Sequence, residues 1–101
     1  MALLERVREK LESTITPARL QDLAFEFGVA PHHLQRLFRK AYGASPRQYQ
    51  ERQRLARAMA LLRAGEPAGE VALSLEYAEA SSFTRAFRRE FGAPPTAFRK
   101  N

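Results

Sequence analysis

Four polar side chains recur at i, i+3, i+4 and i+7 in the helix expected between Pro31 and Gly43. They are His32, Gln35, Arg36 and Arg39. This spacing places them on one helix face, while Leu34, Leu37, Phe38 and Ala41 are expected to point inward. An arginine can donate two hydrogen bonds to guanine, and a glutamine can pair with adenine. The exposed face therefore has the side chains needed to read base edges.

These side chains divide into two expected roles. Gln35 and Arg36 are the stronger candidates for base reading, and His32 is a weaker one. Arg39 and Lys40 lie toward the end of the helix and offer mainly charge, which favours contact with phosphate.

The two halves of the chain repeat each other, and the repeat supplies a second set of candidates. Residues 33–49 align with residues 82–98, with six identities in seventeen positions. With a shift of 48, Asp22-Leu23-Ala24 aligns with Glu70-Val71-Ala72. The second base-reading candidates are Arg85 and, more weakly, Ser81 and Thr84, and the second phosphate-contacting candidates are Arg88 and Arg89.

The net charge of +6 is concentrated in the middle of the chain. Residues 34–64 contain a single carboxylate, Glu51, and eight cations: Arg36, Arg39, Lys40, Arg47, Arg52, Arg54, Arg57 and Arg63. This excess is greater than solvation of a helix requires, so a polyanionic partner is expected.

Several classes of function find no support in the sequence. The chain has no cysteine, which excludes disulfides, thiolate zinc sites and cysteine nucleophiles. The adjacent His32 and His33 point to different helix faces, so no metal site is expected. No phosphate loop, nucleophile elbow or paired carboxylate is recognisable, so we predict neither an enzyme nor a cofactor. No apolar run approaches the ~20 residues of a membrane span, and a cytoplasmic protein is expected.

The elements that must position these side chains are all predicted to be helices. The first contains Leu3 to Leu11, and Thr16-Pro17 is expected to start the second, which ends at Gly28. After the helix that opens at Pro31, Ser45-Pro46 starts a long helix to about Arg63, with Tyr49, Leu55, Ala56, Met59 and Leu62 buried. A fifth helix carries Val71 to Leu75, a sixth runs from about Ala80 to Phe91, and a short turn follows Pro94-Pro95. The fold class is thus all-α with about seven helices.

Two segments connect this pattern to a known family. They are Gly28 to Phe38 (GVAPHHLQRLF) and Ser82 to Gly92 (SFTRAFRREFG), the latter followed by Ala93-Pro94-Pro95. The chain resembles the tandem helix-turn-helix DNA-binding domain of the AraC/XylS family of bacterial transcription regulators, from about Thr16 to Arg99.

The resemblance implies one AraC-type DNA-binding domain over residues 1–101, with homeodomain-like helix packing. Its first helix-turn-helix lobe would cover about 16–45, its linker helix about 46–63, and its second lobe about 66–99. At 1.5 Å per residue the linker spans about 27 Å, which suits two recognition helices about 34 Å apart in successive major grooves.

The resemblance also implies partners. These are double-stranded DNA and RNA polymerase, without a membrane, in the bacterial cytoplasm at the nucleoid. The chain resembles the stand-alone MarA/SoxS kind, expected to be a monomer on DNA, and it equally fits part of a longer regulator that another domain dimerises. Two other functions stay open: a protein-interaction module that docks on the transcription machinery, and a nonspecific nucleic-acid binder.

Two positions depart from the family pattern. Glu76 stands where the family usually has glycine, and in the repeat it matches Gly28. A left-handed backbone there would cost a non-glycine residue roughly 1 kcal/mol. Ala30 stands where the family often has a serine or threonine cap, so the helix that begins at Pro31 is expected to lack that stabilisation.

Overall fold

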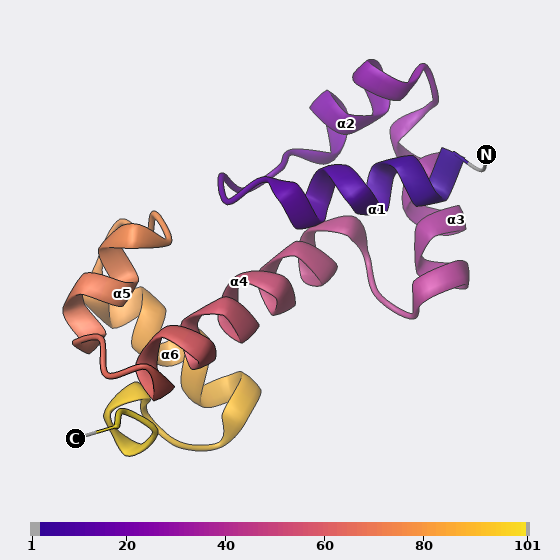
Figure 1. Cartoon of the computed structure of the whole chain (residues 1–101). Helices are drawn as coiled ribbons and strands as arrows, with labels where there is room; N and C mark the ends of the chain where they lie inside the picture. The colour runs from indigo at the N-terminus through magenta and orange to yellow at the C-terminus, as the bar shows by residue number, and fades with distance from the viewer. Residues whose placement is uncertain (1–2, 101) are drawn as a thin grey trace. The chain divides into compact units, whose positions relative to one another are not determined.

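The chain is all-helical in the computed structural model, which describes residues 3–100 (Figure 1). The elements are α1 (Leu3–Ser13), α2 (Leu20–Phe27), α3 (Pro31–Tyr42), α4 (Pro46–Arg63), α5 (Ala68–Ser74), α6 (Ala80–Phe91) and the 3-10 helix η1 (Pro95–Ala97). No strand occurs in the described range, so the predicted fold class is confirmed. The chain divides within α4 into two compact units, unit 1 up to Glu51 and unit 2 from Arg52.

Unit 1 has its own hydrophobic core, in which α1, α2 and α3 pack on one another (Figure 1). Its fully buried members are Val7, Leu11, Leu23, Ala24, Leu34 and Phe38. The Phe38 ring lies 4.6 Å from the Tyr42 ring and 5.5 Å from the Tyr49 ring, measured between centroids. These aromatic contacts join the end of α3 to the first turn of α4.

Unit 2 repeats this arrangement with different side chains. Its core consists of Leu55, Ala58, Leu62, Val71, Ala72, Leu75, Phe83 and Phe87. The Phe87 ring lies 4.6 Å from the Phe91 ring and 5.7 Å from the Phe98 ring. This trio occupies the repeat positions of Phe38, Tyr42 and Tyr49, so the same aromatic cluster closes both units.

The turn after the first helix of each pair has the same backbone geometry in the two units. Gly28 has a φ of 70°, and the Val29 amide donates to the Ala24 carbonyl at 2.9 Å. Glu76 has a φ of 62°, and the Tyr77 amide donates to the Ala72 carbonyl at 3.0 Å. The expectation of a left-handed Glu76 is therefore confirmed. Among residues 3–100 it is the one non-glycine residue with a positive φ.

The predicted start of α2 at Thr16-Pro17 is wrong, because α2 begins at Leu20 with Arg19 as its N-cap. A buried glutamine from α4 holds the preceding segment in a non-helical path. Gln50 Oε1 accepts from the Ala18 amide at 2.7 Å, and Gln50 Nε2 donates to the carbonyls of Thr14 and Thr16 at 2.9 and 3.0 Å. These bonds satisfy backbone groups of a segment that is not helical, and the Thr16 carbonyl, which a longer helix would have paired internally, is among them.

The start of α4 at Ser45-Pro46 is confirmed, and the structure adds a capping box to it. Ser45 Oγ accepts from the Gln48 amide at 3.2 Å, and Gln48 Oε1 accepts from the Ser45 amide at 3.0 Å. The pattern serine-x-x-glutamine is a known sequence signature of this cap. The first turn of α4 is therefore fixed by its own side chains.

Two alanines predicted to be inward are exposed, namely Ala41 and Ala56. In α4 the inward positions of unit 2 are Leu55, Ala58 and Leu62, and Ala56 lies beside this row. In α3 the fully buried positions are Leu34 and Phe38, and the half-buried Tyr42 covers the following turn. The row of large side chains sets the buried face in both helices, and an alanine next to it stays outside.

The side chains of Arg8, Glu12 and Tyr49 connect α1 with α4 inside unit 1. Arg8 Nη1 lies 3.2 Å from Glu12 Oε2, and the Tyr49 hydroxyl donates to the same carboxylate. The hydrogen bond from Tyr49 is the main cause that holds the pKa of Glu12 below its usual range, with Arg8 adding to the effect. Burial raises the pKa of the Tyr49 hydroxyl. The carboxylate of Glu12 thus stabilises unit 1 in its charged form.

Candidate nucleic-acid interface

The helix α3 has one buried and one polar face. Leu34 and Phe38 are fully buried, Leu37 is half-buried, and Pro31 occupies the first turn. On the other side His32, Arg36, Arg39 and Lys40 are exposed, and Gln35 is half-buried. The N-cap Ala30 makes no side-chain hydrogen bond, as expected from its type. The predicted candidates in this half thus share one helix and its outward side.

The helix α6 presents the same arrangement over the same length of 12 residues. Phe83 and Phe87 are its fully buried residues. Ser81, Arg85, Arg88 and Arg89 are exposed, and Thr84 is half-buried. The side chains that the repeat paired by sequence therefore have matching exposure in the two units.

His33 was expected on a different face from His32, and in the structure it lies close enough to the polar face of α3 to contact Arg36. Arg36 Nη2 lies 3.1 Å from His33 Nδ1, within hydrogen-bond distance. Arginine can only donate, so the imidazole must offer a lone pair on Nδ1, as the neutral ring protonated on Nε2 does. Sequence reasoning assigned no role to His33, although its i, i+3 spacing to Arg36 is the signal that could have found this contact.

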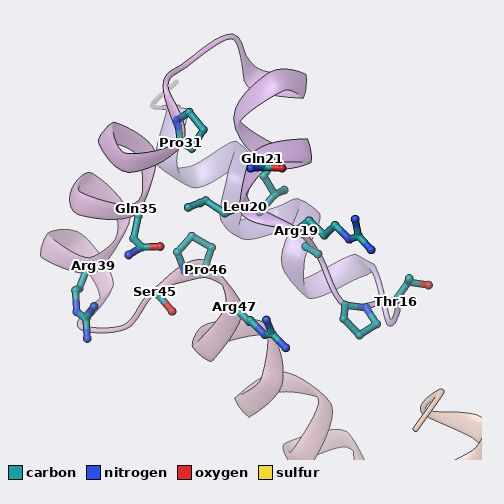
Figure 2. Close-up of a pocket in the computed structure, with 13 residues that line it drawn as sticks. Thr16, Arg19, Leu20, Gln21, Pro31, Gln35, Arg39, Ser45, Pro46 and Arg47 are labelled. Carbon is teal, nitrogen blue, oxygen red and sulfur yellow. The ribbon is translucent and has the colours of Figure 1, made fainter. Parts of the chain in front are cut away.

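An open cleft of about 1010 Å³ lies beside α3 in unit 1 (Figure 2). It is lined by Thr16, Pro17, Ala18, Arg19, Leu20, Gln21, Leu23, Pro31, Gln35, Arg39, Ser45, Pro46 and Arg47. Two predicted site residues, Gln35 and Arg39, line it together with Arg19 and Arg47, which were not among the predicted site residues. Figure 2 shows Pro31, Gln35 and Arg39 on successive turns of α3, with Arg47 at the start of α4.

One of the eight cations in residues 34–64, Arg54, is buried and stabilises the fold. Arg54 is 7% exposed, its guanidinium carbon lies 4.0 Å from the centre of the Tyr77 ring, and Nη2 donates to the Leu75 carbonyl at 3.0 Å. It therefore caps the end of α5, because positive charge is favourable at a helix C-terminus. The other seven cations are exposed.

Within residues 3–100, no three side chains of the metal-ligating types come together. No helix in the described part of the chain is both long and apolar enough to cross a membrane.

Comparison with known proteins identifies a family and several relatives. A family described as "Helix-turn-helix domain" matches residues 23–101. The chain is 31% identical over 86 residues to the right origin-binding protein of Escherichia coli K12, covering 84% of this chain and 30% of that protein. It is 33% identical over 100 residues to the probable transcriptional regulator LumQ of Photobacterium leiognathi, covering 97% and 39%. The chain thus spans about a third of the length of these relatives.

Solved structures share the fold over nearly the whole chain. The DNA-binding domain of the global transcriptional factor AdpA, solved with a target DNA, has a TM-score of 0.86 at 26% identity, covering 97% of this chain and 90% of that one. A probable AraC family transcriptional regulator from Rhodopseudomonas palustris CGA009 has a TM-score of 0.82 at 26% identity, covering 94% and 92%.

Proposed function

The chain belongs to the AraC-type helix-turn-helix family of DNA-binding transcription regulators, and on this premise we propose that it reads two segments of one duplex. In this proposal α3 and α6 are recognition helices that enter successive major grooves. The duplex is recognised by sequence, and one protomer suffices for binding.

The observation that carries the proposal is the repetition of one surface in two units. Each unit buries two large side chains of a 12-residue helix, Leu34 and Phe38 in α3 and Phe83 and Phe87 in α6. Each helix leaves arginines on its exposed side, and it follows a turn of the same geometry. A helix that follows a short turn and presents polar side chains outward is what a recognition helix requires.

The roles of individual side chains follow from their chemistry. Arg36 and Arg85 occupy equivalent exposed positions, and each can donate two hydrogen bonds to a guanine. Gln35 can pair with adenine, and His32, Ser81 and Thr84 are weaker base-reading candidates. The phosphate-contacting set is Arg39, Lys40, Arg88 and Arg89, whose charge positions the protein without specifying sequence.

Selection of bound DNA from a random duplex pool, repeated at two salt concentrations, tests this proposal. Two preferred blocks about ten base pairs apart are expected, since one helical turn separates successive major-groove segments on one face. A pool without any preferred block, bound with an affinity that collapses as salt rises, would reduce the function to nonspecific binding.

A second partner, RNA polymerase, is favoured by two exposed apolar side chains. Phe25 on α2 and Leu73 on α5 are 89% and 75% exposed, and they lie 48 residues apart at equivalent repeat positions. If the chain activates transcription in the bacterial cytoplasm, it needs such a contact in addition to DNA. The double variant Phe25→Ser and Leu73→Ser should bind DNA normally and lose its effect on transcription in a reconstituted assay. An unchanged transcriptional effect would remove these two side chains from the proposal.

A further inference from the structure

We infer that the cleft of unit 1 seats the phosphodiester backbone of the bound duplex, and that unit 1 supplies more of the salt-dependent affinity than unit 2. This inference rests on the proposed function. It adds Arg19 and Arg47 to the site, and it assigns the two units unequal parts in binding.

The cleft is positively charged without any opposing carboxylate. Three arginines line it, Arg19, Arg39 and Arg47, and no aspartate or glutamate does. None of the carboxylates of unit 1 lines this cleft: Asp22 and Glu26 line a smaller pocket that Arg19 also lines, and two carboxylates pair with cations on α1. Glu12 pairs with Arg8 at 3.2 Å, and Glu26 pairs with Lys10 at 3.3 Å. Unpaired cations gathered around a concave surface attract an anion more strongly than the same charges spread among carboxylates.

Three separate elements deliver these arginines, and the backbone of each is fixed. Arg19 is the N-cap of α2 and follows the segment that Gln50 holds through Ala18, Thr14 and Thr16. Arg47 lies in the first turn of α4, which the Ser45–Gln48 capping box closes. Arg39 lies in the last turn of α3. Because these anchors are already ordered, binding does not have to pay for ordering their backbone.

The cleft is continuous with the base-reading face, which favours DNA over a free anion or an acidic peptide. Gln35 and Arg39 belong to the polar side of α3 and also line the cleft (Figure 2). A strand whose phosphates lie in the cleft therefore passes directly beside Gln35. A small anion would engage the arginines without any need for this adjacency.

Unit 2 lacks two of the three cations at the corresponding positions. Pro67 is the N-cap of α5 as Arg19 is the N-cap of α2, and η1 begins at Pro95 as α4 begins at Pro46. The repeat therefore places Pro67 opposite Arg19 and Thr96 opposite Arg47. Arg88 keeps the position of Arg39. The same surface in unit 2 thus has one arginine where unit 1 has three.

Salt dependence of DNA binding tests the inference. The double variant Arg19→Gln and Arg47→Gln should lower the slope of log affinity against log salt by about 1.8, since each lost phosphate contact removes about 0.9. From about 50 to about 200 mM salt, the wild type should then lose about 12-fold more affinity than the variant. The loss of affinity should be the same on the selected site and on random duplex.

A charge-matched control is the double variant Arg6→Gln and Arg63→Gln, whose positions do not line the cleft. It removes the same formal charge and should change the slope much less. Equal slopes for the two double variants would overturn the inference while leaving the proposed function intact, provided the wild type still selects its motif. A wild type that selects no motif would instead contradict the proposed function.

A variant that adds a positive charge to unit 2 also tests the unequal contributions of the two units to DNA binding. Thr96 is exposed at the repeat position of Arg47, so Thr96→Arg should steepen the salt slope by up to about 0.9. An unchanged slope would overturn the account of unequal units. Thermal unfolding of every variant should stay close to that of the wild type, because all five positions are exposed and the contact of Arg6 with the Phe27 ring, 5.5 Å from its centre, contributes little at an exposed site.

Discussion

The side chain of Arg36 is restrained by a neighbouring residue of α3. The Nδ1 atom of His33, three residues earlier in α3, lies 3.1 Å from Arg36 Nη2, and the adjacent residue Gln35 lines the cleft, whereas Arg36 does not. The contact with His33 limits the orientations of the guanidinium in the free protein, so that less side-chain entropy is lost on binding. Sequence periodicity predicted the face on which Arg36 lies, but it did not identify this restraint.

Replacement of Arg36 by alanine tests base reading. The affinity for the selected site should fall by about 1–3 kcal/mol, because a bidentate contact with guanine is lost, while affinity for random duplex should change little. Competition binding with both duplexes measures the two losses. Arg89→Ala serves as the control, since a phosphate contact should cost the same on both duplexes. Equal losses for Arg36→Ala would instead assign it to phosphate.

At the scale of elements, the backbone conformation of the turn after α2 recurs after α5, although the residues that form the two turns differ. The turn after α5 keeps the backbone of the turn after α2, although Glu76 replaces the glycine. The repeat made this backbone predictable from sequence. The start of α2 was not predictable in the same way, because the bonds that shorten it come from Gln50, more than 30 residues away.

Glu76→Gly should raise the stability of the chain. Glycine adopts a left-handed backbone without the roughly 1–2 kcal/mol of strain that a side chain adds, and its greater freedom in the unfolded chain offsets part of this gain, so that a net gain of up to about 1 kcal/mol is expected. For a chain of this size that amounts to about 4–8 °C in the midpoint of thermal unfolding. Ala78→Gly in the same connection is the matched control, and it should lower the midpoint because it only adds freedom to the unfolded chain. If the midpoint of thermal unfolding of Glu76→Gly is at or below that of the wild type, the backbone at Glu76 does not destabilise the protein.

The link between α1 and α4 should make stability depend on pH in the acid range. The pKa of Glu12 is lowered in the folded state, mainly by the Tyr49 hydroxyl. Its contribution is therefore fully present above the unfolded pKa of about 4.3 and is lost as pH falls through the lower folded value. Glu12→Gln should be less stable than the wild type near neutral pH, and the difference should narrow on acidification.

Chemical denaturation of both proteins across this pH range measures the effect of Glu12. The control is Glu9→Gln, which removes the same charge from an exposed position of α1. A gap between wild type and Glu12→Gln that stays constant down to low pH would show that the charge of Glu12 is not what stabilises the link.

At the scale of the whole molecule, the sequence predicted the architecture well because the same sequence pattern occurs in both halves of the chain. Two copies of the glycine, aromatic and proline spacing made the helices and their order predictable. The sequence could not indicate that Gln50 and Arg54, two polar residues in a strongly basic helix, are buried. Both hold distant backbone groups, Gln50 in unit 1 and Arg54 in unit 2. In a helix, local pattern alone does not separate such residues from solvated ones.

The proposed reading of DNA by equivalent polar faces in the two units predicts separable effects on specificity. In selections from a random pool, Arg36→Ala should flatten one preferred block and Arg85→Ala the other, with each variant keeping the second block. Because each substitution removes one arginine from an exposed position, neither should alter the midpoint of thermal unfolding appreciably. Loss of both blocks in either variant would contradict independent reading by the two units.

The separate cores described above also have a consequence for how such a protein changes over generations. Each core is completed by side chains of its own unit, with Phe38 fully buried in one and Phe87 fully buried in the other. Substitutions on the outer side of α3 therefore leave the packing of α6 undisturbed, and the reverse also holds. Drift can remove arginines from one copy while selection retains them in the other. If α3 and α6 read DNA as proposed, a lineage with this architecture can change its preferred DNA one half at a time, while the unchanged half keeps the protein on its site.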